Sequence, residues 1–360
     1  MMARSRSSPR ARSLSEWIRA LAGGLWNAVP PVRRPQVRRF LLTVGRSDDT
    51  EMDPQVYERR MRREIAHYER IFRGRMKEET PPIWTEVERR FEDAIEAKIG
   101  VRSLYHYVAR HVRGKSHVSV LGLGSGACGP ELEGIAPMLR EQQCGMDLMC
   151  IDINPTIMEQ ARLEARKRGV SFRGLVADVN TLTLDPERYD VIVAYAALHH
   201  FVALDRIARE INRGLRPDGI FVTVDIPTRN GYRMWDETHT IVTALWKVLP
   251  AKYKIAHTGY PTPTYVETYE NEDYSRDSFE CINSEAILPA LRHHLHEVAF
   301  VPALCIARRF FDTKFGPNYD LDDALDRAIF EFIMRLDGYY IETGALKPET
   351  FFGAYARKQP

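Results

Sequence analysis

The fold of this chain is decided by one stretch, Leu121-Gly122-Leu123-Gly124-Ser125-Gly126-Ala127-Cys128-Gly129. A β-rich run, residues 118–123, leads into it, and residues 132–140 follow with the pattern of a helix. Glycines at a strand-to-helix turn let the backbone approach a ligand closely. The helix that follows offers free N–H groups and a positive dipole end, which favour an anionic group. The stretch therefore predicts a ligand-binding turn, with a plain tight turn as the alternative.

The spacing of the glycines narrows the choice of ligand only slightly. Gly124, Gly126 and Gly129 satisfy G-x-G-x-x-G, the dinucleotide fingerprint. Because that pattern fits nicotinamide cofactors, flavins and S-adenosylmethionine (SAM) alike, the ligand has to be argued from the residues that follow.

Short apolar runs alternate with helical patterns over residues 117–228. The further runs are residues 148–151, 172–176, 191–197 and 220–224. The helices between them are residues 155–168 and 203–215, and the second ends at the turn Arg216-Pro217-Asp218-Gly219. Strands that alternate with helices imply βαβ units with right-handed crossovers and a parallel sheet. The sequence thus predicts a doubly wound α/β domain.

The flanking segments have other patterns. Residues 53–113 predict amphipathic helices that pack on the domain and can form one wall of a substrate pocket. Residues 229–295 are rich in aromatic side chains, and we expect them to cover the acceptor site as a lid, with a packed helical subdomain as the alternative. Residues 298–307 and 351–356 predict closing strands, and residues 321–336 a helix. The expected organisation is a tail (1–50), a helical layer (51–114), a core (115–228), an aromatic lid (229–295) and the closing part of the core (296–360).

Charge is spread unevenly along the 360 residues. Residues 1–50 carry ten arginines against three acids, a net charge of +7 in a chain of net charge +2, which leaves −5 on the rest. A mildly acidic body argues against binding of a nucleic-acid backbone as the main function. For the tail three interpretations stay open: a flexible basic segment, an amphipathic helix on a membrane surface or a protein partner through residues 1–46, and an organelle targeting segment.

The five cysteines indicate the redox state of the cell compartment in which the protein works. They include no CxxC pair and their number is odd, so we interpret them as reduced thiols of a cytoplasmic protein. The sequence contains no run of about 18 apolar residues, so it predicts no membrane-spanning helix.

An acid at the end of the second predicted strand points to a nucleoside. Asp152 follows Gly126 by 26 residues, close to the interval at which a carboxylate accepts hydrogen bonds from ribose hydroxyls. The alternative is a helix cap for the segment that starts at Asn154-Pro155, and one residue can serve both purposes.

A third acid and a histidine pair complete the series. Asp178 ends the third predicted strand, and Leu198-His199-His200-Phe201 ends the fourth. With the glycine turn and Ile151-Asp152-Ile153-Asn154, this order resembles class I SAM-dependent methyltransferases over residues 115–228. The resemblance implies a seven-stranded, mostly parallel sheet with an antiparallel last strand. It also implies that the glycine turn holds the methionine part of SAM, Asp152 the ribose and Asp178 the adenine amino group. The expected cofactor-binding residues are Gly122, Gly124, Gly126, Asp152, Ile153, Asp178, Val179 and Tyr195.

The chain departs from this family in its glycine turn. Many members carry an acid where Gly122 stands, and it often contacts the amino group of SAM. Cys128 occupies the place of the usual third glycine. The contact to the amino group is therefore expected from elsewhere, with Glu131 as the candidate.

Four residues are candidates for the catalytic base. His199 and His200 lie where the fourth strand ends, beside the expected methyl group, and an imidazole titrates near neutral pH. Shaping the pocket or capping the next helix is the alternative role for the pair. Asp225 and His239 are further candidates. We expect no metal site, because the cluster His293-His294-x-His296 fits a solvated helix face better than a set of ligands.

The resemblance implies transfer of a methyl group from SAM to a small-molecule acceptor, which we expect to be an oxygen of a sugar or natural product. A nicotinamide-dependent oxidoreductase and a non-catalytic scaffold that binds a partner are the alternatives. Methylation of RNA is disfavoured by the acidic body, so no nucleic-acid partner is expected.

Deletion of residues 1–46 is expected to leave the affinity for S-adenosylhomocysteine unchanged, because the predicted cofactor site begins only at the glycine turn. Calorimetric titration of the truncated and full-length chains measures this affinity. Loss of binding on truncation would show that the tail belongs to the folded domain.

Overall fold

The computed structural model describes residues 52–72 and 80–359. All described residues belong to one compact unit, the second of the two into which the chain divides, residues 48–360. The expectations for the basic tail therefore lie outside the described residues.

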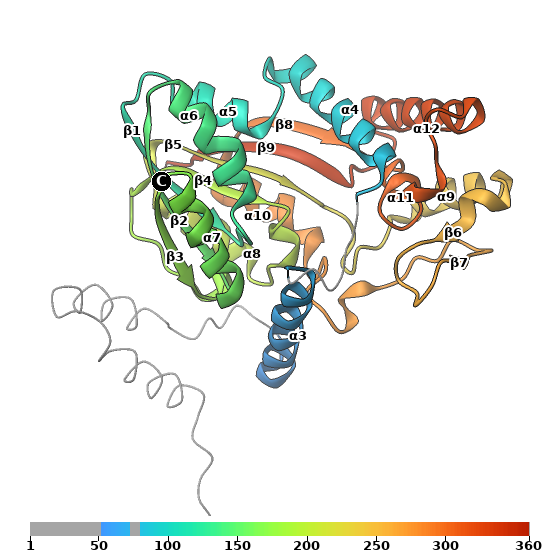
Figure 1. Cartoon of the computed structure of the whole chain (residues 1–360), viewed down its shortest axis with the longest axis horizontal. Coiled ribbons are helices and arrows are strands. Elements are labelled where there is room, and N and C mark those ends of the chain that lie inside the picture. Colours follow the sequence, from blue (N-terminus) through green and yellow to red (C-terminus); the bar gives the residue numbers. More distant parts are fainter. Residues whose placement is uncertain (1–51, 73–79, 360) are drawn as a thin grey trace, which may run out of the picture. The chain divides into compact units, whose positions relative to one another are not determined.

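A seven-stranded sheet forms the centre of the second unit (Figure 1). Its order is β3-β2-β1-β4-β5-β9-β8, and β9 alone runs antiparallel to its neighbours β5 and β8. The strands are β1 (His117–Leu123), β2 (Gly145–Asp152), β3 (Ser171–Val176), β4 (Tyr189–Tyr195), β5 (Leu215–Asp225), β8 (Leu295–Ala303) and β9 (Thr350–Arg357). The predicted doubly wound, mostly parallel sheet with an antiparallel last strand is confirmed.

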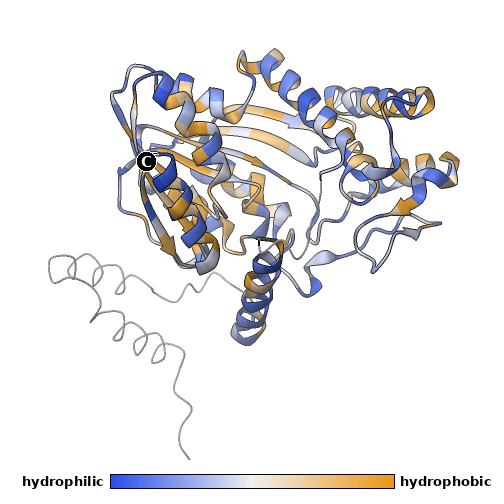
Figure 2. Ribbon diagram, viewed as in Figure 1, coloured by the Kyte–Doolittle hydropathy of each residue, from blue (hydrophilic) through white to orange (hydrophobic). Residues whose placement is uncertain are grey.

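The central strands are apolar because both faces of the sheet are covered. Every residue of β4 is buried except its last, Tyr195, and β1 is buried from Val120 to Leu123. Near-continuous apolar runs of this kind are typical of parallel strands between two helical layers. Figure 2 shows the same concentration of hydrophobic residues along the strands.

Helices surround the sheet. They are α3 (Pro54–Phe72), α4 (Pro82–Ile99), α5 (Leu104–His111), α6 (Ala136–Glu141), α7 (Pro155–Lys167), α8 (Leu204–Gly214), α9 (Asp236–Val248), α10 (Ile287–His294), α11 (Arg308–Phe311) and α12 (Ala324–Thr343). A π-helical turn, Pro130–Ile135, precedes α6. The start of α7 is fixed by Asn154, whose side chain accepts hydrogen bonds from the N–H groups of Thr156 and Ile157.

Two hydrophobic clusters among the described residues position the site and the segments around it. The first lies between the sheet and helices α4 to α7, and Val108, Leu132 and Val193 are among its fully buried members. The second joins α4, α9, α11 and α12, and contains Trp246, Tyr253 and Phe310. Trp246 packs against Tyr269 and Phe315 at ring-centroid distances of 5.0 and 4.7 Å. Many aromatic rings of residues 229–295 thus serve to pack the second hydrophobic cluster.

The end of β8 differs from the predicted strand over residues 298–307. The strand stops at Ala303, and Leu304 has a positive φ of 53° that turns the chain into α11. The buried carboxylate of Asp337 then accepts hydrogen bonds of 2.7 Å from the N–H groups of Ile306 and Ala307. These contacts with α12, far away in sequence, decide where the strand ends.

The small pair β6 (Ile255–Ala256) and β7 (Thr264–Tyr265) forms a separate antiparallel sheet. Across residues 52–72 and 80–359, no helix has the length and apolar character needed to cross a bilayer.

Candidate active site

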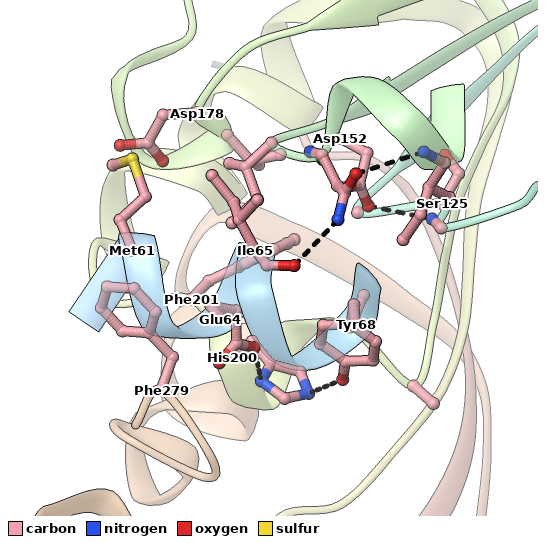
Figure 3. A pocket seen from close by; sticks show the side chains of 18 of the residues that line it. Met61, Glu64, Ile65, Tyr68, Ser125, Asp152, Asp178, His200, Phe201 and Phe279 are labelled. Carbon is pink, nitrogen blue, oxygen red and sulfur yellow. Dashed lines mark hydrogen bonds and ion pairs between the residues drawn. The ribbon is translucent and has the colours of Figure 1, made fainter. Parts of the chain in front are cut away.

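A cavity of about 370 Å³ opens at the carboxyl ends of the parallel strands, below helix α3 (Figure 3). Its volume lies in the range of roughly 300–1,000 Å³ that is common for small-molecule sites. It is lined by the glycine turn, by the residues that follow β2, β3 and β4, and by side chains of α3. In open α/β sheets this edge is where ligands bind, because the strand order reverses there between neighbouring strands.

The glycine turn is built for close approach. Gly124 and Gly126 have φ angles of +60° and +53°, which disfavour any residue with a side chain. A Cβ at Gly124 would lie 2.9 Å from the ring of Phe201, whereas nothing lies within 4 Å of the corresponding position at Gly126. Gly124 is therefore required for packing, and Gly126 exposes its backbone to the cavity.

Asp152 ties the glycine turn to the end of β2. Its Oδ2 accepts a hydrogen bond of 3.0 Å from the N–H of Gly126, and its Oδ1 accepts one of 2.9 Å from the N–H of Asn154. Each carboxylate oxygen has a further lone pair for a ligand hydroxyl. Burial raises the pKa of Asp152, and the two backbone donors oppose that shift.

Asp178 stands at the end of β3 and contacts α3 directly. Its Oδ1 accepts from the N–H of Asn180 at 2.9 Å, and its Oδ2 accepts from the hydroxyl of Tyr57 at 2.7 Å. The side chain of Asn180 in turn accepts from the N–H groups of Val202 and Ala203. One polar network therefore joins α3, the end of β3 and the start of α8.

Glu131 fills the space beside Gly122. A Cβ at Gly122 would lie 2.4 Å from Oε1 of Glu131, so a side chain at position 122 and this carboxyl group exclude one another. Glu131 is 2% exposed, and burial raises its pKa to about 7. Its Oε2 has no hydrogen-bond partner within the described parts of the chain, and the residue lines the cavity. A ligand cation at this place would pair with it.

One region of the cavity lining is apolar. It contains Met61 and Ile65 of α3 together with Phe201 and Phe279, and Met61 lies beside Asp178 (Figure 3). Phe279 comes from the aromatic segment 229–295 and packs on Tyr57 with ring centroids 5.2 Å apart. Most of the cover over the cavity is provided by α3, with Phe279 as the contribution of the aromatic segment to the lining.

A group of polar side chains around His200 lies near this apolar region. Glu64 Oε1 lies 3.0 Å from Nδ1 of His200, and the hydroxyl of Tyr68 lies 3.3 Å from its Nε2 (Figure 3). Burial opposes a charge on His200, but Glu64 and Glu280 outweigh it and raise its pKa to about 9.

His199 belongs to a buried pair behind this group. Its Nδ1 lies 2.7 Å from Oδ1 of Asp225, and both side chains are buried. The carboxylate of Asp225 also accepts hydrogen bonds from the N–H groups of Ala197, Leu198 and Ile226. Burial opposes the charge, yet His199 and these donors lower the pKa of Asp225.

The structure brings most of the predicted residues to one cavity. Those that line it are Gly124, Gly126, Asp152, Ile153, Asp178, Val179, Tyr195 and His200. Gly122, His199 and Asp225 lie behind this lining, and His239 stands on α9, away from the lining. Sequence reasoning missed Tyr57, Glu64 and Tyr68 as individual site residues, although the helical spacing of the α3 face was a usable signal. It also missed Glu280, for which the sequence holds no signal.

Comparison with known proteins agrees with this arrangement. Residues 122–223 match the family model described as a methyltransferase domain. A sterol 4-C-methyltransferase of Caenorhabditis elegans is 26% identical over 141 residues, covering 39% of this chain and 40% of the relative. A demethylmenaquinone methyltransferase of Thermus thermophilus is 28% identical over 93 residues, covering 26% and 42%. The chain thus spans less than half of the length of these relatives.

Among the solved structures that the chain matches is the geranyl diphosphate C-methyltransferase of Streptomyces coelicolor A3(2). It is 14% identical, with 71% of this chain and 79% of that chain covered and a TM-score of 0.39. The family match and the sheet order observed here define the class: residues 122–223 carry a methyltransferase domain, set in a seven-stranded, mostly parallel sheet, and SAM is the cofactor of that domain.

Binding of S-adenosylhomocysteine is expected to weaken about tenfold from pH 8 to pH 6. The carboxyl group of Glu131, with a pKa of about 7, is ionised above that pH and neutral below it, and the ligand ammonium group favours the ionised form. Calorimetry at each pH measures the affinity, and Glu131→Gln should remove the dependence. Glu133→Gln is the matched control, since Glu133 pairs with Arg168 at the surface. An unchanged pH profile in Glu131→Gln would contradict the assignment.

Proposed function

We propose that this chain transfers the methyl group of SAM to an oxygen of a small, largely apolar molecule. The observation that carries the proposal is that the lining of one cavity combines a polar and an apolar part. Asp152 and Asp178 follow β2 and β3, Glu131 lies in the π-helical turn Pro130–Ile135, and apolar side chains with a histidine–carboxylate group form the rest of the lining.

The polar part suits the cofactor. Asp152 would accept hydrogen bonds from the ribose, Asp178 from the adenine amino group, and Glu131 would pair with the ammonium group of the methionine part. The exposed backbone at Gly126 allows the ligand to approach the turn. These three acids come from different elements, so their convergence on one cavity is a property of the fold.

The apolar part suits the acceptor. Met61, Ile65 and Phe279 would bury an apolar molecule and exclude water from the methyl group. The two curated relatives named above carry the names of a sterol and a demethylmenaquinone methyltransferase, and apolar acceptors of that general kind fit this lining.

The histidine–carboxylate group favours a hydroxyl on the acceptor. In the proposed step the oxygen forms a bond to the methyl carbon, the carbon–sulfur bond breaks, and its electron pair stays on sulfur. The hydroxyl proton passes to the carboxylate of Glu64, which lines the cavity beside His200, because a pKa of about 9 keeps His200 itself protonated near neutral pH. The step requires the oxygen to lie about 3–3.5 Å from the methyl carbon, in line with the bond that breaks.

The proposal includes the cell compartment, which we infer from the cysteines to be the cytoplasm. All five cysteines fall in the described part of the chain and all are free and buried. Reduced thiols are the rule in the cytoplasm, and we place the protein there.

The test begins with S-adenosylhomocysteine and NADH titrated separately by calorimetry. We expect micromolar binding of S-adenosylhomocysteine and no binding of NADH. The reverse result would overturn methyl transfer and support hydride transfer as the function. The enzyme is then incubated with SAM labelled with ¹³C in its methyl group and a panel of sterols, quinols and phenols. A labelled methoxy signal in the product supports an oxygen acceptor, and a labelled carbon-bound methyl signal would overturn that part.

A further inference from the structure

Three side chains of the kinds that bind metal ions lie close together at the wall of the cavity. His199 and His200 follow β4, and Glu280 comes from the segment between α9 and α10. One ligand atom from each residue lies within 4.8 Å of the others. His200 lines the cavity, and Glu280 follows Phe279, which also lines it. Residues about 80 positions apart in sequence therefore converge on the site where the acceptor is proposed to bind.

The two imidazole rings are held from behind by carboxylates. Asp225 Oδ1 lies 2.7 Å from Nδ1 of His199, and Glu64 Oε1 lies 3.0 Å from Nδ1 of His200. Histidines that bind metals almost always give their second ring nitrogen to a carboxylate or carbonyl, which fixes the tautomer and turns the other nitrogen to the metal. In both histidines a carboxylate lies beside Nδ1, and Nε2 is the ring nitrogen that lies within 4.0 Å of Glu280.

Glu280 lies opposite the two Nε2 atoms at a distance that fits an ion better than a hydrogen bond. Its carboxylate oxygens are 4.0 Å from Nε2 of His199 and 3.8 Å from Nε2 of His200. Both distances exceed the range of a hydrogen bond. Ligands around a tetrahedral zinc ion, with bonds of about 2.0–2.1 Å, lie about 3.3 Å apart. The side chain of Glu280 is 36% exposed and has room to move by the small remaining difference.

We infer that His199, His200 and Glu280 form a binding site for a divalent first-row transition metal ion, with Zn²⁺ as the fitting example. Two imidazoles and one carboxylate suit Zn²⁺ and Fe²⁺, in contrast to the all-oxygen sets preferred by Mg²⁺ and Ca²⁺. Three protein ligands leave a fourth position open, as in catalytic rather than structural zinc sites. The hydroxyl of Tyr68 lies 3.3 Å from Nε2 of His200, and a metal ion would replace this contact.

A metal at this place would act as a Lewis acid on the acceptor. It would hold the acceptor oxygen and lower the pKa of its hydroxyl group, so that the oxygen attacks the methyl group more readily. This role rests on the proposed function, whereas the binding site itself does not.

A second cluster needs to be told apart from this one. Cys128, Glu131 and Cys150 also have ligand atoms within 4.8 Å of one another, but all three are buried, and of these only Glu131 lines the cavity. Burial raises the pKa of Cys150 well above its ordinary value and disfavours the thiolate that a metal requires. The two clusters differ in ligand chemistry, since one holds thiols and the other holds none.

The experiment titrates Co²⁺ into full-length protein freed of metal by a chelator, and follows the visible spectrum. One equivalent is expected to bind and to give a spectrum of nitrogen and oxygen ligation without an intense sulfur-to-metal band. Competition with Zn²⁺, followed by calorimetry, gives the affinity. Glu280→Gln should weaken Zn²⁺ binding by about 100-fold or more, and Glu64→Gln, which loosens His200 without removing a ligand, by about 10–100-fold.

The controls separate this inference from the proposed function. Glu285→Gln, five residues from Glu280 and hydrogen-bonded to the backbone of Asn230, should bind Zn²⁺ like the unaltered chain. S-adenosylhomocysteine affinity, measured on every variant, reports the fold and the cofactor site independently of metal. Absence of stoichiometric binding, equal affinity in Glu280→Gln, or binding that is lost only in Cys150→Ala would overturn the inference. Metal binding together with no methyl transfer would leave the site in place and overturn the proposed function.

Discussion

Replacement of Asp152 by alanine is expected to weaken binding of S-adenosylhomocysteine by at least tenfold. Hydrogen bonds from ribose hydroxyls to a charged carboxylate contribute about 1.5–3 kcal/mol each. The substitution also removes the acceptor of the N–H of Gly126, so the glycine turn loses its link to the end of β2. Calorimetric titration of the purified variant measures the change.

Two further variants make this result interpretable. Asp147→Ala changes an acid of the same strand whose side chain is 64% exposed and pairs with His117, so it should bind the ligand normally. Asp152→Asn keeps one oxygen acceptor and should fall between the alanine variant and the unaltered protein. An affinity in Asp152→Ala equal to that of Asp147→Ala would remove Asp152 from the cofactor site.

Replacement of Asp225 by alanine is expected to lower the free energy of unfolding by about 3–5 kcal/mol. The carboxylate is fully buried and accepts hydrogen bonds from the backbone N–H groups of Ala197, Leu198 and Ile226 and from the ring of His199. Without it, these donors stay buried with no acceptor, and each such group costs about 1–3 kcal/mol. Unfolding in urea, followed by circular dichroism, gives the difference.

The matched control for this variant is Asp205→Ala. Asp205 also contacts a histidine, His294, at 2.7 Å, but its own side chain is 64% exposed. Exposed pairs of this kind contribute about 0–1 kcal/mol. If both variants lost the same small amount, Asp225 would have no special part in holding the end of β4 against the end of β5.

The sheet and the residues that directly follow its strands could be predicted from the sequence, because both depend on local sequence patterns. Gly124 and Asp152 follow short apolar strands, and the carboxyl ends of parallel strands meet at one edge of a sheet. The position of each residue after its strand was therefore enough to place it near the others. The alternation of strands and helices, read from residues 117–228, led to the sheet that the structure shows.

The remaining features depend on contacts between distant segments. The spacing of Tyr57, Met61, Ile65 and Tyr68 predicts a helix with an apolar face, but only the fold shows that this face lines the cavity. Glu280 lies in an irregular segment, and nothing local indicates that it faces two histidines. The aromatic residues of segment 229–295 have the composition of a lid, yet Trp246 and Tyr253 pack in the second hydrophobic cluster, because α11 and α12 supply the apolar surface that they cover.

The contacts of α3 have a thermodynamic consequence. Tyr57 of this helix bonds to Asp178 where the cofactor is proposed to bind, and Glu64 and Tyr68 contact His200 where the acceptor is proposed to bind. A ligand at either place that alters these contacts changes the position of one shared helix. The affinity of the cofactor for the protein and that of the acceptor are then linked, and each ligand must change the other's binding free energy by the same amount.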